Sequence, residues 1–260
     1  MGNRRWPNTA GSVLAAALLL AGCSSPSGQL RRGLSPGSDG GKYPLHTGIV
    51  STTFWVGEVF DPNASDGSQA ISTYDSSWFA HYGGCDGVNV GAGVKKCSTE
   101  NRTSANGYFP TRMTPQQNPF YLDLPFDDLN DRTAYRERGH IIPWAHDPGY
   151  AGHATDPSFS YMKNRWVKLM RYGRTCYAQI EDAGPAKYHD AAYVFGSDNR
   201  RPASTRFNRA GMDVSPAVNG CLDYSELDGE NDKVNWRFVD AADVPAGPWK
   251  RIVTTQGVVN

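Results

Sequence analysis

Three carboxylic acids stand where they could support acid–base chemistry: Glu58, Asp182 and Asp213. Cleaving a glycosidic bond needs a protonated acid beside the leaving oxygen. An inverting hydrolase also needs an ionised carboxylate about 6.5–9.5 Å away to activate water. Acids in different environments can hold these different protonation states. Asp213 follows Met212 in an apolar stretch, where burial would favour the protonated form.

Each of these acids also has an ordinary structural explanation. Asp213 could cap a helix that starts near Ser215, and Asp182 could be a turn residue before Gly184. Glu58 could be a loop carboxylate without a function. The elements that position the acids are therefore needed to choose between these interpretations.

Alternating apolar and polar residues predict a mainly β domain with long loop insertions. A segment that begins as a strand at residue 211 is expected to become a short helix, with Ser215 as N-cap and Pro216 at the first helical position. Stretches 57–107 and 126–160 show no clear period and are expected to be loop-rich. The predicted strands cover residues 47–56, 119–125, 165–171, 175–181, 233–239 and 252–255.

Four motifs occur in a recognisable order: TTFW at 52–55, EDAGP at 181–185, GMDVSP at 211–216 and VNWRFV at 234–239. In this order the chain resembles the double-psi β-barrel domains of expansins, barwin-like proteins, family-45 glycoside hydrolases and the rare lipoprotein A family. The long stretches between the motifs lie outside the resemblance. It implies a six-stranded double-psi β-barrel whose two insertions wall an open groove.

The resemblance also implies roles for the acids. Asp213 matches the Asp-x-Ser acid, which is the proton donor in the glycosidases and lytic transglycosylases of this group. Asp182 matches a second acid that lines the same groove. Family-45 enzymes place their base where this chain has Val56, a departure that lowers the expectation of inverting hydrolysis. The nearest substitute is Glu58, and weaker ones are Asp61 and Asp75.

The function expected from this resemblance is cleavage of β-1,4 bonds in a polysaccharide outside the cytoplasm. An endoglucanase-like hydrolase and a peptidoglycan lytic transglycosylase both remain open, and the polymer could be a plant β-glucan or peptidoglycan. A lytic transglycosylase may need only one acid, because a hydroxyl of the substrate replaces water. The alternatives are a non-catalytic, expansin-like glycan binder that loosens walls, and an envelope interaction module with a degraded site.

The first motif and the glycine-rich stretch offer residues that could contact a sugar. Trp55 and Trp78 are candidate stacking platforms, since flat aromatic rings pack against sugar faces. Thr53 precedes the aromatic pair, and Asp86 lies beside a cysteine, where it could border a groove or form a plain turn. Trp236, in an alternating strand, is expected in the core.

The N-terminus is typical of a lipoprotein signal. Residues 1–22 contain two arginines and a short apolar run that ends in Leu-Ala-Gly before Cys23. We therefore expect cleavage before Cys23 and lipidation of its thiol, which would tether the protein to the cell envelope outside the cytoplasm. An ordinary secretory signal is the alternative. Residues 23–42 are rich in Ser, Gly and Pro and predict a flexible spacer before a folded domain at 43–260.

An even number of cysteines remains after Cys23, namely Cys85, Cys97, Cys176 and Cys221. In an oxidising compartment this number suggests two disulfides. Three connectivities are possible; we favour Cys85–Cys97 and Cys176–Cys221. No Cys-x-x-Cys pair supports a metal site instead.

Composition limits the partners. Residues 1–22 carry two basic and no acidic residues, so the remaining chain has 24 basic and 26 acidic residues. This balance argues against a nucleic-acid partner, which would favour a basic face. We expect a monomer that binds a polysaccharide, contacts the membrane only through its lipid and uses no cofactor or metal.

Overall fold

The computed structural model describes residues 40–59, 69–89 and 96–259 of the chain. Cys23, the signal segment, Asp61 and most of the expected spacer lie outside these residues. The end of that spacer is held in place: the ammonium group of Lys42 lies 2.9 Å from a carboxylate oxygen of Asp240.

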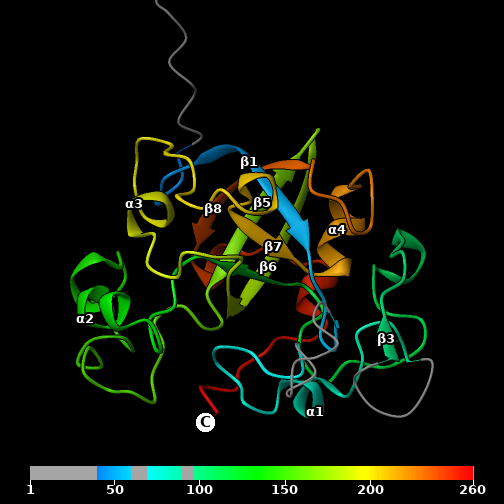
Figure 1. Ribbon diagram of the computed structural model, residues 1–260, viewed down its shortest axis with the longest axis horizontal. Coiled ribbons are helices and arrows are strands. Elements are labelled where there is room, and N and C mark those ends of the chain that lie inside the picture. The colour runs from blue at the N-terminus through cyan, green and yellow to red at the C-terminus, as the bar shows by residue number, and fades with distance from the viewer. Residues whose placement is uncertain (1–39, 60–68, 90–95, 260) are drawn as a thin grey trace, which may run out of the picture. The chain divides into compact units, whose positions relative to one another are not determined.

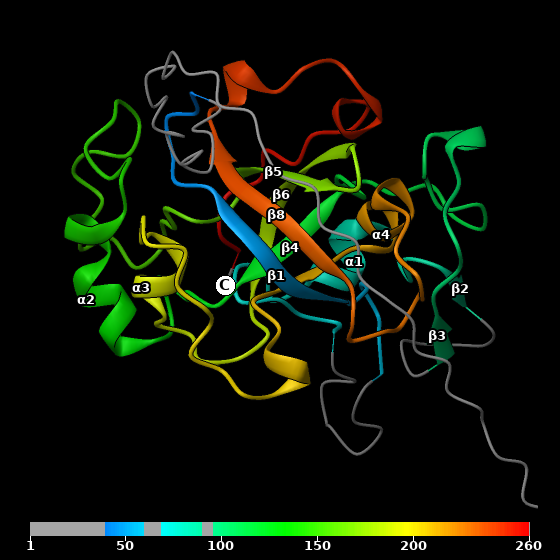
Figure 2. The same ribbon diagram turned by 90° about the horizontal axis from the view of Figure 1, so that it is seen from above.

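Six strands close into a mixed barrel (Figures 1 and 2). Around the barrel the order is β1-β7-β4-β6-β5-β8. The pairs β1–β7 and β4–β6 are parallel and the other four pairs are antiparallel. The strands are β1 (His46–Thr53), β4 (Tyr121–Leu124), β5 (Trp166–Arg171), β6 (Arg174–Ala183), β7 (Met212–Val214) and β8 (Lys233–Val239).

Short helices and loops decorate this barrel. In both views α2 lies on the opposite side of the barrel from the small β2–β3 ladder (Figures 1 and 2). The α-helices are α1 (Trp78–Tyr82), α2 (Arg132–Ile141), α3 (Ala191–Val194) and α4 (Pro216–Leu222), and the ladder pairs β2 (Val88–Asn89) with β3 (Cys97–Ser98). Among the described residues, no helix has both the length and the apolar character that a membrane crossing requires.

The main strand predictions are confirmed, and so is the helix start after β7. The Ser215 side chain accepts a hydrogen bond from the N–H of Val218, and Pro216 opens α4. Helix α2 was not predicted; Asp131 caps it by accepting from two main-chain N–H groups. The strand predicted at 252–255 is wrong. The Thr254 N–H donates to the side chain of Gln179 rather than to a neighbouring strand.

The barrel interior is filled from alternating strand positions. Val234, Trp236 and Phe238 of β8 are buried, as the alternation predicts. The Trp236 ring stacks on His46 at 4.2 Å between centroids and donates from its indole N–H to the Tyr193 hydroxyl. This packing leaves the ends of the strands to carry the polar groups.

The structure contains one of the two expected disulfides. Cys85 and Cys97 are joined and connect the loop after α1 to β3. The prediction of a Cys176–Cys221 disulfide is wrong, because both residues are buried free thiols. Burial and the neighbouring Cys221 raise the pKa of the Cys176 thiol, and the Cys221 sulfur lies 3.8 Å from the Thr175 carbonyl oxygen. The two cysteines are neighbours, but no covalent bond joins them.

Candidate active site

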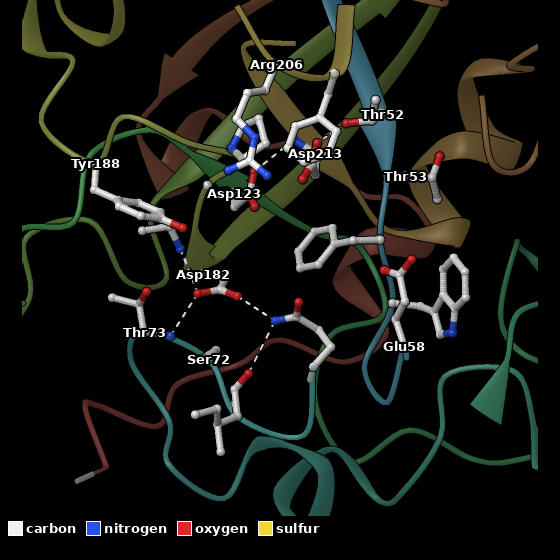
Figure 3. Close-up of a pocket in the computed structure, with 18 of the residues that line it drawn as sticks. Thr52, Thr53, Glu58, Ser72, Thr73, Asp123, Asp182, Tyr188, Arg206 and Asp213 are labelled. Carbon is white, nitrogen blue, oxygen red and sulfur yellow. Dashed lines mark hydrogen bonds between the residues drawn. The ribbon is translucent and has the colours of Figure 1, made fainter. Parts of the chain in front are cut away.

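A groove of about 1150 Å³ opens at one end of the barrel. Its floor comes from the ends of β1, β4, β6 and β7, and loops before and after these strands complete its walls. Glu58, Asp182 and Asp213, the three acids singled out in the sequence, all line this groove. Figure 3 shows Asp182 and Asp213 on the same side of Glu58.

Strand register arranges the polar groups in a row. Thr52 of β1 pairs with Asp213 of β7, and Asp123 of β4 pairs with Asp182 of β6. Because β7 lies between β1 and β4, and β4 lies between β7 and β6, these four residues span four adjacent strands. Residues separated by up to 161 positions in the chain therefore meet at one edge.

A register irregularity in the β4–β6 pair determines which acids of β6 face the groove. Leu122 pairs with Ile180, but the next residue, Asp123, pairs with Asp182. The skipped residue, Glu181, is buried and pairs with Lys163 at 3.1 Å. A bulge of this kind changes which side chains face a given surface. Here it leaves Asp182 at the groove and Glu181 in a neutralised pair.

Asp213 has the environment expected of a carboxyl group that keeps its proton near neutral pH. Its side chain accepts a hydrogen bond from the Thr52 hydroxyl, and its main-chain N–H donates to Asp123. Burial raises its pKa to about 7; the hydrogen bond from Thr52 opposes this shift, and the nearby charges of Asp182 and Glu230 add to it. Asp213 can therefore hold a transferable proton at neutral pH.

Asp182 is held in one orientation by donors from two segments (Figure 3). Its Oδ1 accepts from the main-chain N–H groups of Thr73 and Ala183, both at 2.8 Å, and its Oδ2 accepts from the Gln69 amide at 2.7 Å. Burial raises its pKa to about 6, although these hydrogen bonds favour the ionised form. At pH 7 Asp182 is mostly a carboxylate, which raises the pKa of Asp213.

Asp123 completes the row and was missed in the sequence. It is 4% exposed, and burial, together with the charges of Asp213 and Asp182, raises its pKa well above the usual range. Gly184 allows its close approach, because a Cβ atom at that position would collide with Asp123 Oδ2. The sequence feature that could have identified Asp123 is its position as the lone acid in the apolar stretch 119–125, because carboxyl groups rarely occupy such positions without a role.

Glu58 lies in the same groove but in a different setting. Its main chain bonds to Trp55 and Gln69. Burial raises its pKa to about 8, and the charge of Asp228 adds to the shift. A group with this pKa is mostly protonated at neutral pH, so it is poorly suited to act as a base there.

Two of the four predicted substrate-binding residues do not reach the groove. Trp78 is buried in a core cluster, and its indole N–H donates to Gln117. Asp86 is also buried, where it accepts from Arg102 at 2.8 Å and from the Tyr121 hydroxyl at 2.7 Å. Both predictions are corrected: Trp78 is a core residue, and Asp86 is half of a buried ion pair.

The other two substrate-binding candidates line the groove. Trp55 is 9% exposed and packs on the Cys85–Cys97 disulfide. Thr53 accepts a hydrogen bond from the Asn219 amide at 2.9 Å. Asp75, a weaker candidate base, is buried away from the groove lining and caps the turn at Ser77.

The groove is strongly acidic. Seven acidic side chains and a single basic one, Arg206, belong to its described lining. No ion pair joins any of the seven acids to a basic side chain of the described residues, whereas acids elsewhere in the barrel domain are often paired. The seven are Glu58, Asp123, Asp127, Asp182, Asp213, Asp228 and Glu230.

Although many acids line the groove, the described side chains that could ligate a metal ion do not form a cluster. Within residues 40–59, 69–89 and 96–259, no three His, Cys, Asp or Glu side chains are grouped so that they could hold a metal ion. The acids of the groove are instead bonded to main-chain N–H groups, a hydroxyl and an amide. This arrangement suits proton transfer by the protein's own carboxyl groups.

Comparison of the chain with protein-family models, with curated proteins and with solved structures found no significant match.

Proposed function

We propose that this protein cleaves β-1,4-glycosidic bonds of a polysaccharide outside the cytoplasm, with Asp213 as the general acid. The observation that carries the proposal is the setting of Asp213: a groove-lining carboxyl group, hydrogen-bonded to Thr52, whose pKa of about 7 leaves it a proton to donate. A groove of about 1150 Å³ is large enough for several sugar units.

The chemistry that this site supports best uses one acid. Asp213 protonates the glycosidic oxygen as the bond to the anomeric carbon breaks. The resulting carboxylate then accepts the proton of a substrate hydroxyl that attacks the same carbon, which closes an anhydro-sugar ring. Proton and electron pairs balance without a second catalytic group. Glu58 is disfavoured as an inverting base by its raised pKa, so lytic transglycosylation is preferred over hydrolysis.

The neighbouring acids support Asp213 in this scheme. Asp182 raises the pKa of Asp213 by its negative charge, and Asp123 fixes the β7 main chain through the Asp213 N–H. Neither needs to touch the reacting atoms. They act as positioning and tuning residues for the acid.

We also propose a family and a cellular location for this protein. The closed six-stranded mixed barrel is compatible with a double-psi β-barrel. Motif order, rather than a match to a known family, supports placing the chain with the expansin, family-45 glycosidase and rare lipoprotein A group. A tether through Cys23 would place the groove near a cell-wall polymer.

Product analysis tests the function. The purified protein would be incubated with peptidoglycan and with amorphous β-1,4-glucans, and the products identified by mass spectrometry. Anhydro-sugar ends are expected from the wild type, and loss of product from Asp213→Asn. Asp228→Asn, an exposed acid of the same groove, is the matched control and should retain activity.

Other outcomes separate the alternatives. New reducing ends would indicate a hydrolase instead. Binding to a glycan without any product would favour the non-catalytic, expansin-like alternative and would overturn the enzyme proposal. Equal cleavage by wild type and Asp213→Asn would show that the acid is assigned to the wrong residue.

A further inference from the structure

Exposed apolar side chains gather at the groove. Five large hydrophobic side chains of the described residues are prominently exposed, and three of them, Ile71, Tyr188 and Phe207, line the groove. Tyr188 and Phe207 are 45% and 40% exposed. By contrast, Trp55 is largely covered and Trp78 is buried. The rings available for a ligand to stack on are therefore not the tryptophans favoured in the sequence.

Phe207 is presented by an unusual backbone. Phe207, Asn208 and Arg209 have consecutive φ angles of 49°, 51° and 62°, in the left-handed region. This conformation is unfavourable for residues other than glycine, and it is found preferentially where a loop must present a group for function. The next strand is β7, which carries Asp213. The strained turn thus places an exposed ring on the wall that leads into the catalytic strand.

Tyr188 occupies another part of the wall. Its carbonyl oxygen accepts a 2.7 Å hydrogen bond from the Asp127 N–H, which fixes the loop after β6 against the segment after β4. In Figure 3 the Tyr188 hydroxyl points toward the space bordered by Asp123 and Asp182. The acid row therefore lies beside an exposed aromatic ring with a polar tip, a combination suited to a sugar face and its hydroxyl groups.

The charge of the residues that line the groove limits the kinds of sugar chain that can bind there. Seven acidic residues and one basic residue, Arg206, line the groove. Burial raises the pKa values of Glu58 and Asp123, so the negative charge of the lining at neutral pH comes from the remaining acids, among them Asp182. The Arg206 guanidinium lies 5.2 Å from the Phe207 ring centre. A cleft of one charge sign repels ligands of that sign, and low-dielectric walls strengthen the effect. A uronic-acid chain, which carries a carboxylate on its sugar rings, would meet this repulsion along the groove.

We propose that Tyr188 and Phe207 are the sugar-stacking residues of this groove, and that the glycan they hold is a β-1,4-linked chain whose sugars are not uronic acids. This inference rests on the proposed polysaccharide-cleaving function and adds its binding residues and substrate class. Tyr188 and Phe207 take the stacking role that the sequence suggested for Trp55 and Trp78. Uronic-acid polymers are not expected among the preferred ligands.

Binding measurements on the full-length protein test the inference separately from catalysis. The probes are hexasaccharides of β-1,4-linked glucose and of β-1,4-linked N-acetylglucosamine, and their C6-carboxylated counterparts, measured by calorimetry with Asp213→Asn to prevent turnover. At least one neutral hexamer should bind. Phe207→Ala and Tyr188→Ala, each added to that variant, should raise its Kd about tenfold, the effect expected for losing an aromatic contact.

The control for ring removal is Tyr172→Ala, since Tyr172 is 90% exposed but lies in the β5–β6 turn, outside the groove lining. It should leave Kd unchanged. The carboxylated counterpart of whichever hexamer binds should bind about tenfold more weakly at low salt, and the difference should shrink in 1 M NaCl, where charges are screened within about 3 Å.

Three results would overturn the inference: equal or tighter binding of the carboxylated chain, unchanged Kd in both ring variants, or no binding of either neutral hexamer. If any of these occurs while wild type still releases products from a glycan, the proposed function stands and only the inference fails. If the neutral chain binds at these rings but no glycan is ever cleaved, the inference on binding survives and the catalytic proposal fails.

Discussion

The main-chain N–H of Asp213 donates a 2.8 Å hydrogen bond to Oδ1 of Asp123. The two residues lie 90 positions apart, on β7 and β4, and the bond joins the proposed acid to a buried acid on the adjacent strand. Because Asp123 is held protonated, it adds a fixed hydrogen-bond acceptor without adding another full charge.

Substitutions at Asp123 should distinguish the contribution of its hydrogen-bond acceptor to stability from that of its ionisable carboxyl group. Asp123→Asn keeps an oxygen acceptor for the Asp213 N–H, so its free energy of unfolding at pH 7 should equal or exceed that of wild type. Asp123→Ala leaves the N–H unpaired at a largely buried position and should lower the free energy of unfolding by about 1–3 kcal/mol. Urea titrations of both variants check this. Equal stability of the two variants would contradict the role assigned to Asp123.

The same pair predicts an unusual pH dependence. A raised pKa in the folded protein means that the stabilisation due to Asp123 is complete below its unfolded pKa near 4 and is lost as pH rises toward the folded value. The stability of wild type relative to Asp123→Asn should therefore fall as pH rises from 4 to 8, by at most about 1.4 kcal/mol per pH unit. A difference that stays constant or grows over this range would show that Asp123 is not protonated in the fold.

The pH profile of activity should report Asp213. As pH rises through about 7 the acid loses its proton, so kcat/KM should fall on the alkaline side. Asp182→Asn removes a charge that raises the pKa of Asp213, and the alkaline limb should move to lower pH. Asp228→Asn should leave the limb in place, because Asp228 acts on Glu58 instead. An unmoved limb in Asp182→Asn would rule out this electrostatic tuning.

Glu58→Gln distinguishes one-acid from two-acid catalysis. With Asp213 alone carrying the proton, the variant should keep kcat within about threefold of wild type and form the same products. Removal of a true general base would lower kcat by about 10²–10⁴-fold. A loss of that size, together with reducing-end products in wild type, would restore Glu58 as the base of an inverting hydrolase.

The Asp86–Arg102 pair should matter for stability and not for binding. Both side chains are fully buried, and Asp86 also accepts from Tyr121. Asp86→Ala leaves a buried guanidinium without its partner and should cost about 3–5 kcal/mol of unfolding free energy. Chemical denaturation measures the cost, and Asp198→Ala, which breaks an exposed pair with Arg200, should cost less than about 1 kcal/mol. Comparable costs would contradict the buried role.

Alkylation can distinguish the free cysteines from those joined in a disulfide. When the protein is unfolded without reductant and alkylated, peptide mapping should find label on Cys176 and Cys221. Cys85 and Cys97 should take label only after reduction. Protection of all four before reduction would show that the pair predicted from the even cysteine count exists in the protein after all.

Local sequence patterns were sufficient for the elements of the barrel. Alternation in 233–239 predicted β8 with Val234, Trp236 and Phe238 inward, and Ser215-Pro216 predicted the start of α4. These features depend on neighbours along the chain: side-chain alternation and capping. The strand predicted at 252–255 is wrong because the main-chain N–H and carbonyl of Thr254 both bond to the Gln179 side chain rather than to a neighbouring strand, which no local pattern reveals.

Tertiary structure alone decided which polar and aromatic residues share the groove. Asp123 became a site residue through the β4–β7 and β4–β6 pairings, and Trp78 and Asp86 became core residues because buried partners satisfy them. The sequence by itself determined strand faces, a helix cap and the acids worth testing, since these follow from residue type and spacing. Register, burial and long-range hydrogen bonds decided the rest, because they arise between segments brought together only when the barrel closes.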